Sequence, residues 1–310
     1  MQHSAASVVG IGAATLDDLW LVPQFSGQEG VVQALQHVQM GGGPVATALC
    51  VLSVLGRHPV ALCDVVGDDE SGRLIRFGLE RHGVDTAALQ MVRNVRSASA
   101  VVMVRQDDGA RQITFLPATC GDLSLDETQR RLISGARLLH LNGRHESAAR
   151  EAVSLARTTG ATISFDGGAG RYRDSLRDLV EASHVRIVSR DFARAYAGVD
   201  KNDDLPALLA ALQRAPAQCV VITDGVKGSH VWVPGEPVFH QPAFPAAVVD
   251  TTGCGDVYHG AFLHGWLEGW PAVKCARFAS QAAACNAEGL GGRWACVHGD
   301  CHALASLLPG

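Results

Sequence analysis

Short apolar runs alternate with helix-like stretches along most of this chain, and this alternation limits its fold more than any other feature. Apolar runs typical of buried strands lie at 8–11, 59–67, 137–142, 161–168, 184–189 and 219–225. Stretches typical of helices lie at 45–56, 69–83, 145–159, 174–182, 191–197 and 204–214. Parallel strands need crossover connections, which are usually helices. The order therefore predicts an α/β fold of three layers, with a mostly parallel central sheet between helices.

Four predicted extended segments break this alternation, because no crossover helix separates them. They lie at 17–22, 31–40, 97–106 and 111–117. The last two flank Asp108 and Gly109, and an Asp-Gly pair between β-rich runs favours a hairpin. We expect a small antiparallel sheet that forms a lid over the active edge of the large sheet. No linker divides the chain, so residues 1–310 are predicted to be one domain, with the lid at about 17–40 and 97–117.

The charge balance excludes a typical nucleic-acid binder. Lys and Arg total 26 against 31 Asp and Glu, a net charge of −5, whereas nucleic-acid binders show a basic excess. No apolar run approaches the roughly 18 residues of a membrane helix, and the first residues lack the pattern of a signal peptide. Nine scattered cysteines favour reduced thiols. We therefore expect a cytoplasmic protein without nucleic-acid or membrane partners.

The most informative stretch is DTTGCGDVYHGAF at 250–262, reached through a strand-like segment at 248–250. Gly253 and Gly255 let backbone N–H groups converge at a helix start, which suits an anion such as phosphate. Asp256 falls in the first turn of that helix. A carboxylate there can take a proton from a hydroxyl while the amides stabilise a transferred phosphoryl group. Taken alone, Asp256 can equally be an acidic residue favoured by the helix dipole.

This stretch and GGGPVATALCVLSVLG at 41–56 resemble the two signatures of the ribokinase-like (PfkB) carbohydrate kinases, in the family's order. The resemblance covers essentially the whole chain. It implies the ribokinase-like fold and phosphorylation of a sugar hydroxyl that depends on ATP and Mg²⁺. It also implies that Asp256 is the catalytic base and that the amides of Gly253, Cys254 and Gly255 form the anion hole. Cys254 replaces the usual Ala, and a reactive thiol at the helix N-terminus stays open.

The resemblance also implies a nucleotide side. The segment CVVITDGVKGS matches the family's Thr-x-Gly-x-x-Gly loop, and a later helix and loop match the family's last nucleotide-side elements. The residues that this places near ATP are Thr223, Gly225, Lys227, Gly228, Ser280 and Gly292. For Lys227 the alternative is a solvated surface lysine.

On the sugar side, the resemblance names Asp17, Gly42, Gly43, Thr47 and Arg144. A carboxylate accepts two sugar hydroxyls, and Asp17 is preferred for this over its neighbour Asp18. Gly42 and Gly43 let the main chain approach the sugar closely, and Thr47 adds a hydroxyl one turn later. Arg144 follows a predicted strand end, and its alternative is a surface arginine that opens the next helix.

Within the family, segments of the chain are most similar to ketohexokinases and to sulfofructose kinases. Both groups act on ketoses, so a ketohexose-like sugar is the favoured substrate. The chain departs from ketohexokinases at Pro44 and Thr47, where they carry Asn. Val31 and Phe115 stand where sulfofructose kinases use a Lys and an Asn for the sulfonate.

The within-class alternative is a kinase for an acidic or phosphorylated sugar, such as 2-keto-3-deoxygluconate or sulfofructose. Such a substrate would rely on Arg144 and on the lid arginines Arg105 or Arg111. The alternative from another class is a non-catalytic regulator that binds a sugar or nucleotide. A nicotinamide enzyme is not expected, because no strand leads into Gly-x-Gly-x-x-Gly.

The family's Asn-x-x-Glu motif, which organises Mg²⁺, is missing, because the chain reads Ser189-Arg190-Asp191-Phe192. No protein side chain is therefore assigned to a metal, and a requirement for a monovalent cation is left open. The resemblance implies a homodimer through the lid. Three ligand-type features have simpler interpretations: His259 as helix packing, Asp166 as a turn cap, and CVHGDCH at 296–302 as a solvated segment with poor zinc spacing.

Overall fold

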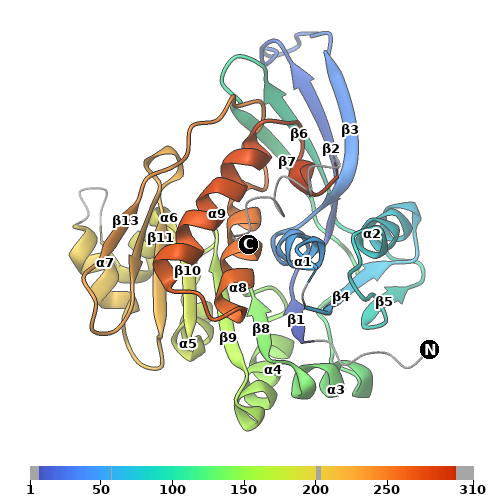
Figure 1. Cartoon of the computed structure of the whole chain (residues 1–310). Helices are drawn as coiled ribbons and strands as arrows, with labels where there is room; N and C mark the ends of the chain where they lie inside the picture. Colours follow the sequence, from blue (N-terminus) through green and yellow to red (C-terminus); the bar gives the residue numbers. More distant parts are fainter. Residues whose placement is uncertain (1–6, 57, 200–203, 298–310) are drawn as a thin grey trace.

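The computed structural model describes residues 7–56, 58–199 and 204–297. Within these ranges, nine strands form one sheet in the order β13-β12-β11-β10-β9-β8-β1-β4-β5 (Figure 1). Neighbours from β11 to β5 run parallel, and β12 and β13 form an antiparallel edge. The strands are β1 (Val8–Ile11), β4 (Val60–Gly67), β5 (Leu89–Val92), β8 (Leu138–Leu141), β9 (Thr162–Gly167), β10 (Val185–Ser189), β11 (Cys219–Thr223), β12 (Ser229–Trp232) and β13 (Phe239–Gln241).

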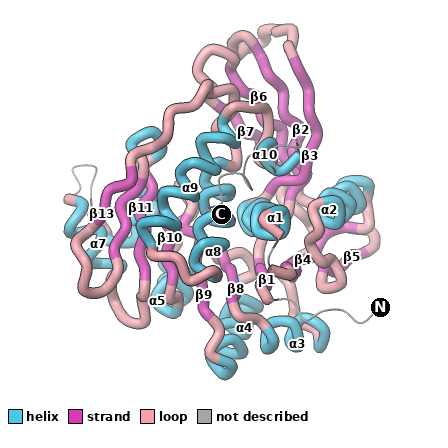
Figure 2. The backbone as a smooth tube through the Cα atoms, in the orientation of Figure 1, coloured by secondary structure: helices cyan, strands magenta, loops and turns pink. Residues whose placement is uncertain are grey.

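Helices cover both faces of this sheet, as Figure 2 shows. One face packs against α1 (Pro44–Val54), α2 (Glu70–Arg81), α8 (Cys254–Leu267), α9 (Ala272–Ala287) and α10 (Trp294–Val297). The other packs against α3 (Glu127–Gly135), α4 (Glu146–Thr159), α5 (Arg177–Ala182), α6 (Arg190–Ala197) and α7 (Leu205–Leu212). In β1, Val8 faces the first layer, whereas Val9 and Ile11 face the second. Burial on both faces explains why the central strands read as continuous apolar runs.

A smaller sheet has the strand order β3-β2-β6-β7. It contains β2 (Thr15–Val22), β3 (Gln36–Gly42), β6 (Ser99–Arg105) and β7 (Arg111–Leu116). The two outer pairings are antiparallel, and the central pairing of β2 with β6 is parallel. Because β2 begins shortly after β1 ends, this sheet extends from the carboxyl edge of the large sheet (Figure 1).

Two predictions of extended structure are wrong. Residues 31–35 precede β3, because the pairing of β2 with β3 begins only at Leu21 and Gln36. Residues 248–250 form no strand, because the N–H of Val249 donates to the carbonyl of Ala287 at the end of α9, at 2.8 Å, instead of to a strand. The structure also adds β5, β12, β13 and α3 to the expected elements.

A buried hydrogen-bond network joins β4 to the start of β2 and to α4. The Asp64 carboxylate accepts from the N–H groups of Ala14 at 2.7 Å and Val65 at 2.8 Å. His145 Nδ1 accepts from the N–H of Leu123 at 3.0 Å, so its ring proton is on Nε2, which donates to Asp64 Oδ1 at 2.7 Å. Asp64 thereby fixes the connection through which the chain leaves the large sheet for the small one.

We expect Asp64→Ala to lower the free energy of unfolding by at least about 2 kcal/mol, because it leaves two buried N–H groups and an imidazole without an acceptor. Urea unfolding followed by circular dichroism measures this change. The matched control is Asp68→Ala, an exposed aspartate paired with Arg73, for which we expect a change within about 0.5 kcal/mol. Equal losses in the two variants would contradict the role given to Asp64.

Candidate active site

One buried carboxylate shapes the loop that leads into α8. Asp250 is fully buried, and its Oδ1 accepts from the N–H of Thr252 at 2.7 Å and from the Thr252 hydroxyl at 2.6 Å. Its Oδ2 accepts from the N–H of Gly291 at 2.9 Å. The first two bonds form the turn before α8, and the third ties that turn to the loop after α9. These three bonds therefore place two loops from distant parts of the chain side by side.

Glycine is required where these two loops touch. Gly253 has a φ of 71°, and a Cβ there would lie 2.3 Å from the carbonyl oxygen of Gly292. Gly255 differs, because a Cβ on it would meet no heavy atom within 4 Å. No described side chain caps the N-terminus of α8. The N–H of Cys254 makes a long bond of 3.4 Å to the carbonyl of Thr251. Among the described residues no acceptor is found for the next two N–H groups, those of Gly255 and Asp256, as an anion site requires.

Cys254 is held as a neutral thiol. The Asn286 side chain donates to the carbonyl of Thr252 at 3.1 Å and lies 3.9 Å from Cys254 Sγ. Burial raises the pKa of the Cys254 thiol to about 12. A thiolate nucleophile needs a lowered pKa, so this geometry favours a role like that of the alanine that Cys254 replaces.

Asp256 lies in the first turn of α8 in an environment that favours its neutral form. Burial is the main reason that its pKa is raised to about 7, and the charge of Asp166 adds to the effect. Arg171 acts in the opposite direction, because its positive charge lowers the pKa of Asp256. A carboxyl group with a pKa near 7 is suited to general base catalysis at neutral pH.

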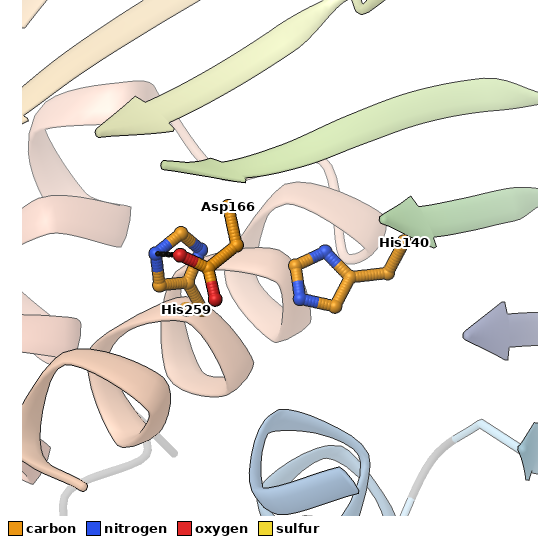
Figure 3. A group of neighbouring side chains, drawn as sticks. All are labelled: His140, Asp166 and His259. Carbon is orange, nitrogen blue, oxygen red and sulfur yellow. Dashed lines mark ion pairs between the residues drawn. The ribbon is translucent and has the colours of Figure 1, made fainter. Parts of the chain in front are cut away.

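A buried cluster formed by His140, Asp166 and His259 lies near Asp256, which precedes His259 by one turn of α8 (Figure 3). His259 Nε2 lies 3.3 Å from Asp166 Oδ1. His140 Nδ1 lies 3.1 Å from the Ser164 hydroxyl. Burial lowers the pKa of His140 to about 3 and also lowers that of His259, so both imidazoles are neutral at pH 7. The sequence suggested a turn cap for Asp166 and helix packing for His259. Neither interpretation includes the contact between these two side chains.

Asp17 and Gly42 meet where β2 and β3 lie beside the glycine run, residues 41–43. Asp17 Oδ1 accepts from the Thr15 hydroxyl at 2.7 Å. A Cβ on Gly42 would lie 1.9 Å from Asp17 Oδ2, so only glycine leaves room for this carboxylate. Burial raises the pKa of Asp17. The neighbouring Asp18 instead lies 3.1 Å from His37 of β3, so Asp17 is the aspartate next to the glycine run.

A buried arginine supports the glycine run. Arg293 is 1% exposed and donates through Nη2 to the carbonyl of Gly42 at 2.8 Å and through Nε to the hydroxyl of Thr47 at 3.1 Å. Gly43 starts α1 with a φ of 90°, and a Cβ there would lie 2.1 Å from the Ala13 carbonyl. Thr47 is itself buried, and its hydroxyl already has this protein partner. Its role as a sugar ligand stays a prediction.

Three arginines named from the sequence have different surroundings. Arg111 of β7 donates through Nη1 to the Thr251 hydroxyl at 3.1 Å and thus connects the small sheet to the loop before α8. Arg144 is half-buried, and within the described part of the chain its guanidinium has no hydrogen-bond or ion-pair partner. Arg105 is paired with two aspartates of its own hairpin. Arg111 and Arg144 are therefore better placed than Arg105 to meet an anionic ligand.

The predicted nucleotide loop follows β11, whose last residue is Thr223. Gly225 has a φ of 53° and begins a short 3₁₀ turn. Gly228 has a φ of 89°, and a Cβ there would lie 2.0 Å from the Gln241 carbonyl, so glycine is required. Lys227 is exposed, and its Nζ lies 3.7 Å from an Asp224 carboxylate oxygen. This position matches the surface-lysine alternative.

Ser280 and Gly292 lie next to different loops. The buried Ser280 hydroxyl of α9 donates to the carbonyl of Pro242 at 3.4 Å, in the segment that packs against Gly228. Gly292 instead lies against Gly253. Ser280 therefore borders the predicted nucleotide loop, whereas Gly292 borders the loop at 250–253 before α8, here named the anion loop because it leads into the proposed anion site. Their roles toward ATP stay predictions.

The residues that stand in place of the missing Asn-x-x-Glu motif make structural contacts. The Ser189 hydroxyl caps α6. Arg190 Nη1 lies 3.0 Å from Asp224 Oδ2, in the predicted nucleotide loop. Asp191 is paired with Arg194 at 3.1 Å. The carboxylate at this position is thus engaged, and the donor set does not fit the magnesium role of the family motif.

Comparison with known proteins decides the family. The model of the pfkB family carbohydrate kinases matches residues 5–295. The chain belongs to this family. It is similar to an ATP-dependent ribose-1-phosphate kinase of Halopiger xanaduensis, with 27% identity over 92% of this chain and 93% of that protein. A fructokinase of Solanum tuberosum is 29% identical over 84% of this chain and 81% of the fructokinase.

The fold of this pfkB carbohydrate kinase is also found in solved structures. The Arabidopsis thaliana ribokinase complexed with ribose and ATP superposes with a TM-score of 0.82 at 22% identity, and the match covers 98% of this chain and 99% of the ribokinase. The predicted family, the ribokinase-like fold and the enzyme class are therefore confirmed. No helix among the described residues has the length and apolarity needed to cross a membrane.

Sequence reasoning missed two basic residues of the site. Arg171 influences the pKa of Asp256, and Arg293 holds the glycine run. Arg171 follows the carboxyl end of β9, and ligands of open α/β sheets bind beyond the carboxyl ends of strands. That rule could have indicated Arg171. Arg293 stands far along the chain from its partner Gly42, so only the fold brings them together.

We expect Cys254→Ala to keep the kcat/KM of the enzyme within about a factor of two, because a neutral thiol contributes volume and not chemistry. Steady-state kinetics of phosphoryl transfer to the enzyme's best sugar substrate measures this. Iodoacetamide provides a second readout, since a thiol with a raised pKa reacts slowly and should leave the wild-type activity resistant. A loss of more than about a hundredfold in the variant would instead indicate a reactive cysteine.

Proposed function

We propose that this kinase transfers the terminal phosphoryl group of ATP to a hydroxyl of a ketohexose-like sugar, with Asp256 as general base. The observation that carries the proposal is the carboxyl of Asp256, with a pKa raised to about 7, in the first turn of a helix that no described side chain caps. The proposed proton acceptor, Asp256, therefore lies next to the proposed anion site at the start of α8.

The proposed chemistry uses positioning and electrostatics. The Asp256 carboxylate accepts the proton of the sugar hydroxyl. At the same time the oxygen of that hydroxyl forms a bond to the terminal phosphorus of ATP, and the bond from this phosphorus to ADP, the leaving group, breaks. The amides of Gly253, Cys254 and Gly255 stabilise negative charge on the transferred group. The uncapped start of α8 and the open space beside Gly255 support this assignment.

The sugar is proposed to bind between the small sheet and the glycine run. Asp17 accepts two sugar hydroxyls, and Gly42 and Gly43 bring main chain close to the ring. The strand register aligns Asp17 with Ala100 and Phe115 across three strands, so these residues share one face. Phe115 is half-exposed on that face. An apolar ring beside the sugar site favours a neutral ketose over a sulfonated one.

ATP is proposed to bind along the edge formed by Thr223, Gly225, Gly228, Ser280 and Gly292. The close packing of Gly228 against the Gln241 carbonyl supports a shaped backbone at this edge. Mg²⁺ bound to the nucleotide would neutralise phosphate charge. Because the residues at the Asn-x-x-Glu position are otherwise engaged, no step is assigned to protein-bound magnesium.

We propose a single kinase domain over 1–310 in which the small sheet acts as the lid and excludes water on closing. The contact between Arg111 and Thr251 supports a lid that reaches the anion loop. A homodimer through the lid is part of the proposal, and exposed Trp20, Val101 and Leu116 on the small sheet support it. The family's metabolism of small sugars fits a cytoplasmic location.

The specific alternative is a kinase for an acidic or phosphorylated sugar. The half-buried guanidinium of Arg144, which has no partner among the described residues, favours it, as does the position of Arg111 at the anion loop. The relative from Halopiger xanaduensis is named for a phosphorylated sugar, and the one from Solanum tuberosum for fructose. The two candidates therefore differ in whether arginines bind an anionic group of the sugar in addition to the phosphates of ATP.

We expect Asp256→Asn to lower kcat/KM by about a hundredfold or more while leaving nucleotide affinity nearly unchanged. Because the base must be ionised, wild-type kcat/KM should fall as the pH drops below about 7. Arg171 lowers the pKa of Asp256, so Arg171→Gln should move this acidic limb to higher pH. Kinetics from pH 5 to pH 9 measure both effects. Wild-type turnover in Asp256→Asn would contradict the base assignment.

We expect a panel of sugars with ATP to give the highest kcat/KM with a ketohexose and less with ribose 1-phosphate, 2-keto-3-deoxygluconate and sulfofructose. Arg144→Ala should then change the KM for the ketohexose by less than about threefold. The highest kcat/KM with an anionic sugar, lost in Arg144→Ala or Arg111→Ala, would favour the alternative. Nucleotide binding without product from any sugar would indicate a non-catalytic regulator.

A further inference from the structure

The cluster of His140, Asp166 and His259 leaves three buried polar atoms without hydrogen-bond partners. These atoms are His140 Nε2, Asp166 Oδ2 and His259 Nδ1. The three residues are 0%, 3% and 6% exposed. Buried polar groups are nearly always satisfied, because an unmade hydrogen bond costs about 1–3 kcal/mol. Three such atoms in one place indicate that the cluster holds a further group.

We propose that His140, Asp166 and His259 bind a divalent transition-metal ion of the zinc class. The three residues come from β8, β9 and α8, and each offers a ligand atom within 4.8 Å of the other two (Figure 3). His259 Nε2 and Asp166 Oδ1 are already 3.3 Å apart, and a metal ion held by this pair would leave His259 Nδ1 to donate to a water molecule. Two ligands about 2.1 Å from a tetrahedral zinc ion lie about 3.4 Å apart, so this pair needs little movement.

The donor set selects the class of metal. Both imidazoles are neutral, so each has a nitrogen lone pair for a metal. The other ring nitrogen of His140 is oriented by the Ser164 hydroxyl, as is usual for metal-binding histidines. Two nitrogen donors and one carboxylate suit Zn²⁺ or Co²⁺, whereas Mg²⁺ and Ca²⁺ prefer oxygen donors. A water molecule would complete a tetrahedral site.

The surrounding charges also favour a cation. Asp166 and Asp17 are the negative charges that raise the pKa of Asp256, and the opposing positive charges come from Arg171 and Arg293. Counting Asp256 itself, this region contains three carboxyl groups and two guanidinium groups, of which that of Arg171 is exposed. A divalent ion bound to Asp166 would offset this excess of acid and would link both strands to α8. Bound metal should therefore stabilise the folded chain by mass action.

The test uses the full chain, carrying no histidine tag, stripped of metal with dipicolinate and then titrated with Zn²⁺. We expect about one bound zinc per chain by elemental analysis and a rise in the thermal unfolding midpoint with zinc concentration. His140→Gln and His259→Gln should each lose the bound zinc and the rise. The matched control is the double variant His298→Gln, His302→Gln, at a segment outside the described residues, which should keep both.

Cobalt gives a readout that does not depend on the variants folding. Wild-type chain loaded with Co²⁺ should show the strong visible bands of a tetrahedral site with nitrogen and oxygen ligands, without a near-ultraviolet thiolate charge-transfer band. A thiolate band, or zinc lost only in the His298 and His302 variant, would place the metal at the C-terminal cysteines and overturn the proposal. Absence of zinc and cobalt binding would overturn it too, leaving water as the occupant. None of these readouts depends on kinase activity.

Discussion

The candidate active site depends on the three hydrogen bonds that the Asp250 carboxylate accepts. Two of them close the turn before α8, and the third holds the N–H of Gly291. This carboxylate is fully buried, so its bonds are made in a medium of low dielectric constant, where an unpaired charge would be costly. With the turn fixed, Gly253 rests against Gly292 and the start of α8 stays open. The position of Asp256 follows from this arrangement.

A second group of buried contacts positions the residues proposed to bind the sugar. Asp64 fixes Ala14 just before β2, and Arg293 holds the carbonyl of Gly42 at the end of β3. The carboxylate of Asp17 can therefore lie where a side chain on Gly42 would clash with it. Arg111 joins the small sheet to the anion loop through Thr251. The small sheet is thus anchored at both the glycine run and the anion loop.

Much of the fold could be predicted because the central strands are buried on both faces. Such strands read as apolar runs, and the helices between them leave few topologies. The short strands β12 and β13 were missed because they form the antiparallel end of the sheet and carry polar residues such as His230 and His240. Val248 and Val249 are apolar like strand residues, yet the N–H of Val249 donates to the carbonyl of Ala287 at the end of α9. Apolar sequence alone does not reveal which partner a backbone group finds.

The site was predictable where a motif is continuous in sequence. Asp256 and its glycines lie within a few residues, so their shared helix start could be read directly. Arg293 and the partners of Asp166 could not, because the fold brings them together from separate elements. The contact of Thr47 shows the same limit, since its hydroxyl accepts from Arg293, a residue far along the chain, while its role toward the sugar stays a prediction.

The central claim is that the loop shaped by Asp250 builds the anion site used in phosphoryl transfer. It is tested most directly by the kcat of Asp250→Asn, with nucleotide affinity measured in parallel by calorimetry. The amide cannot accept all three bonds, so we expect kcat to fall by about a hundredfold while the Kd for ATP changes by only about threefold. A kcat equal to that of the wild type in a folded Asp250→Asn protein would contradict the account.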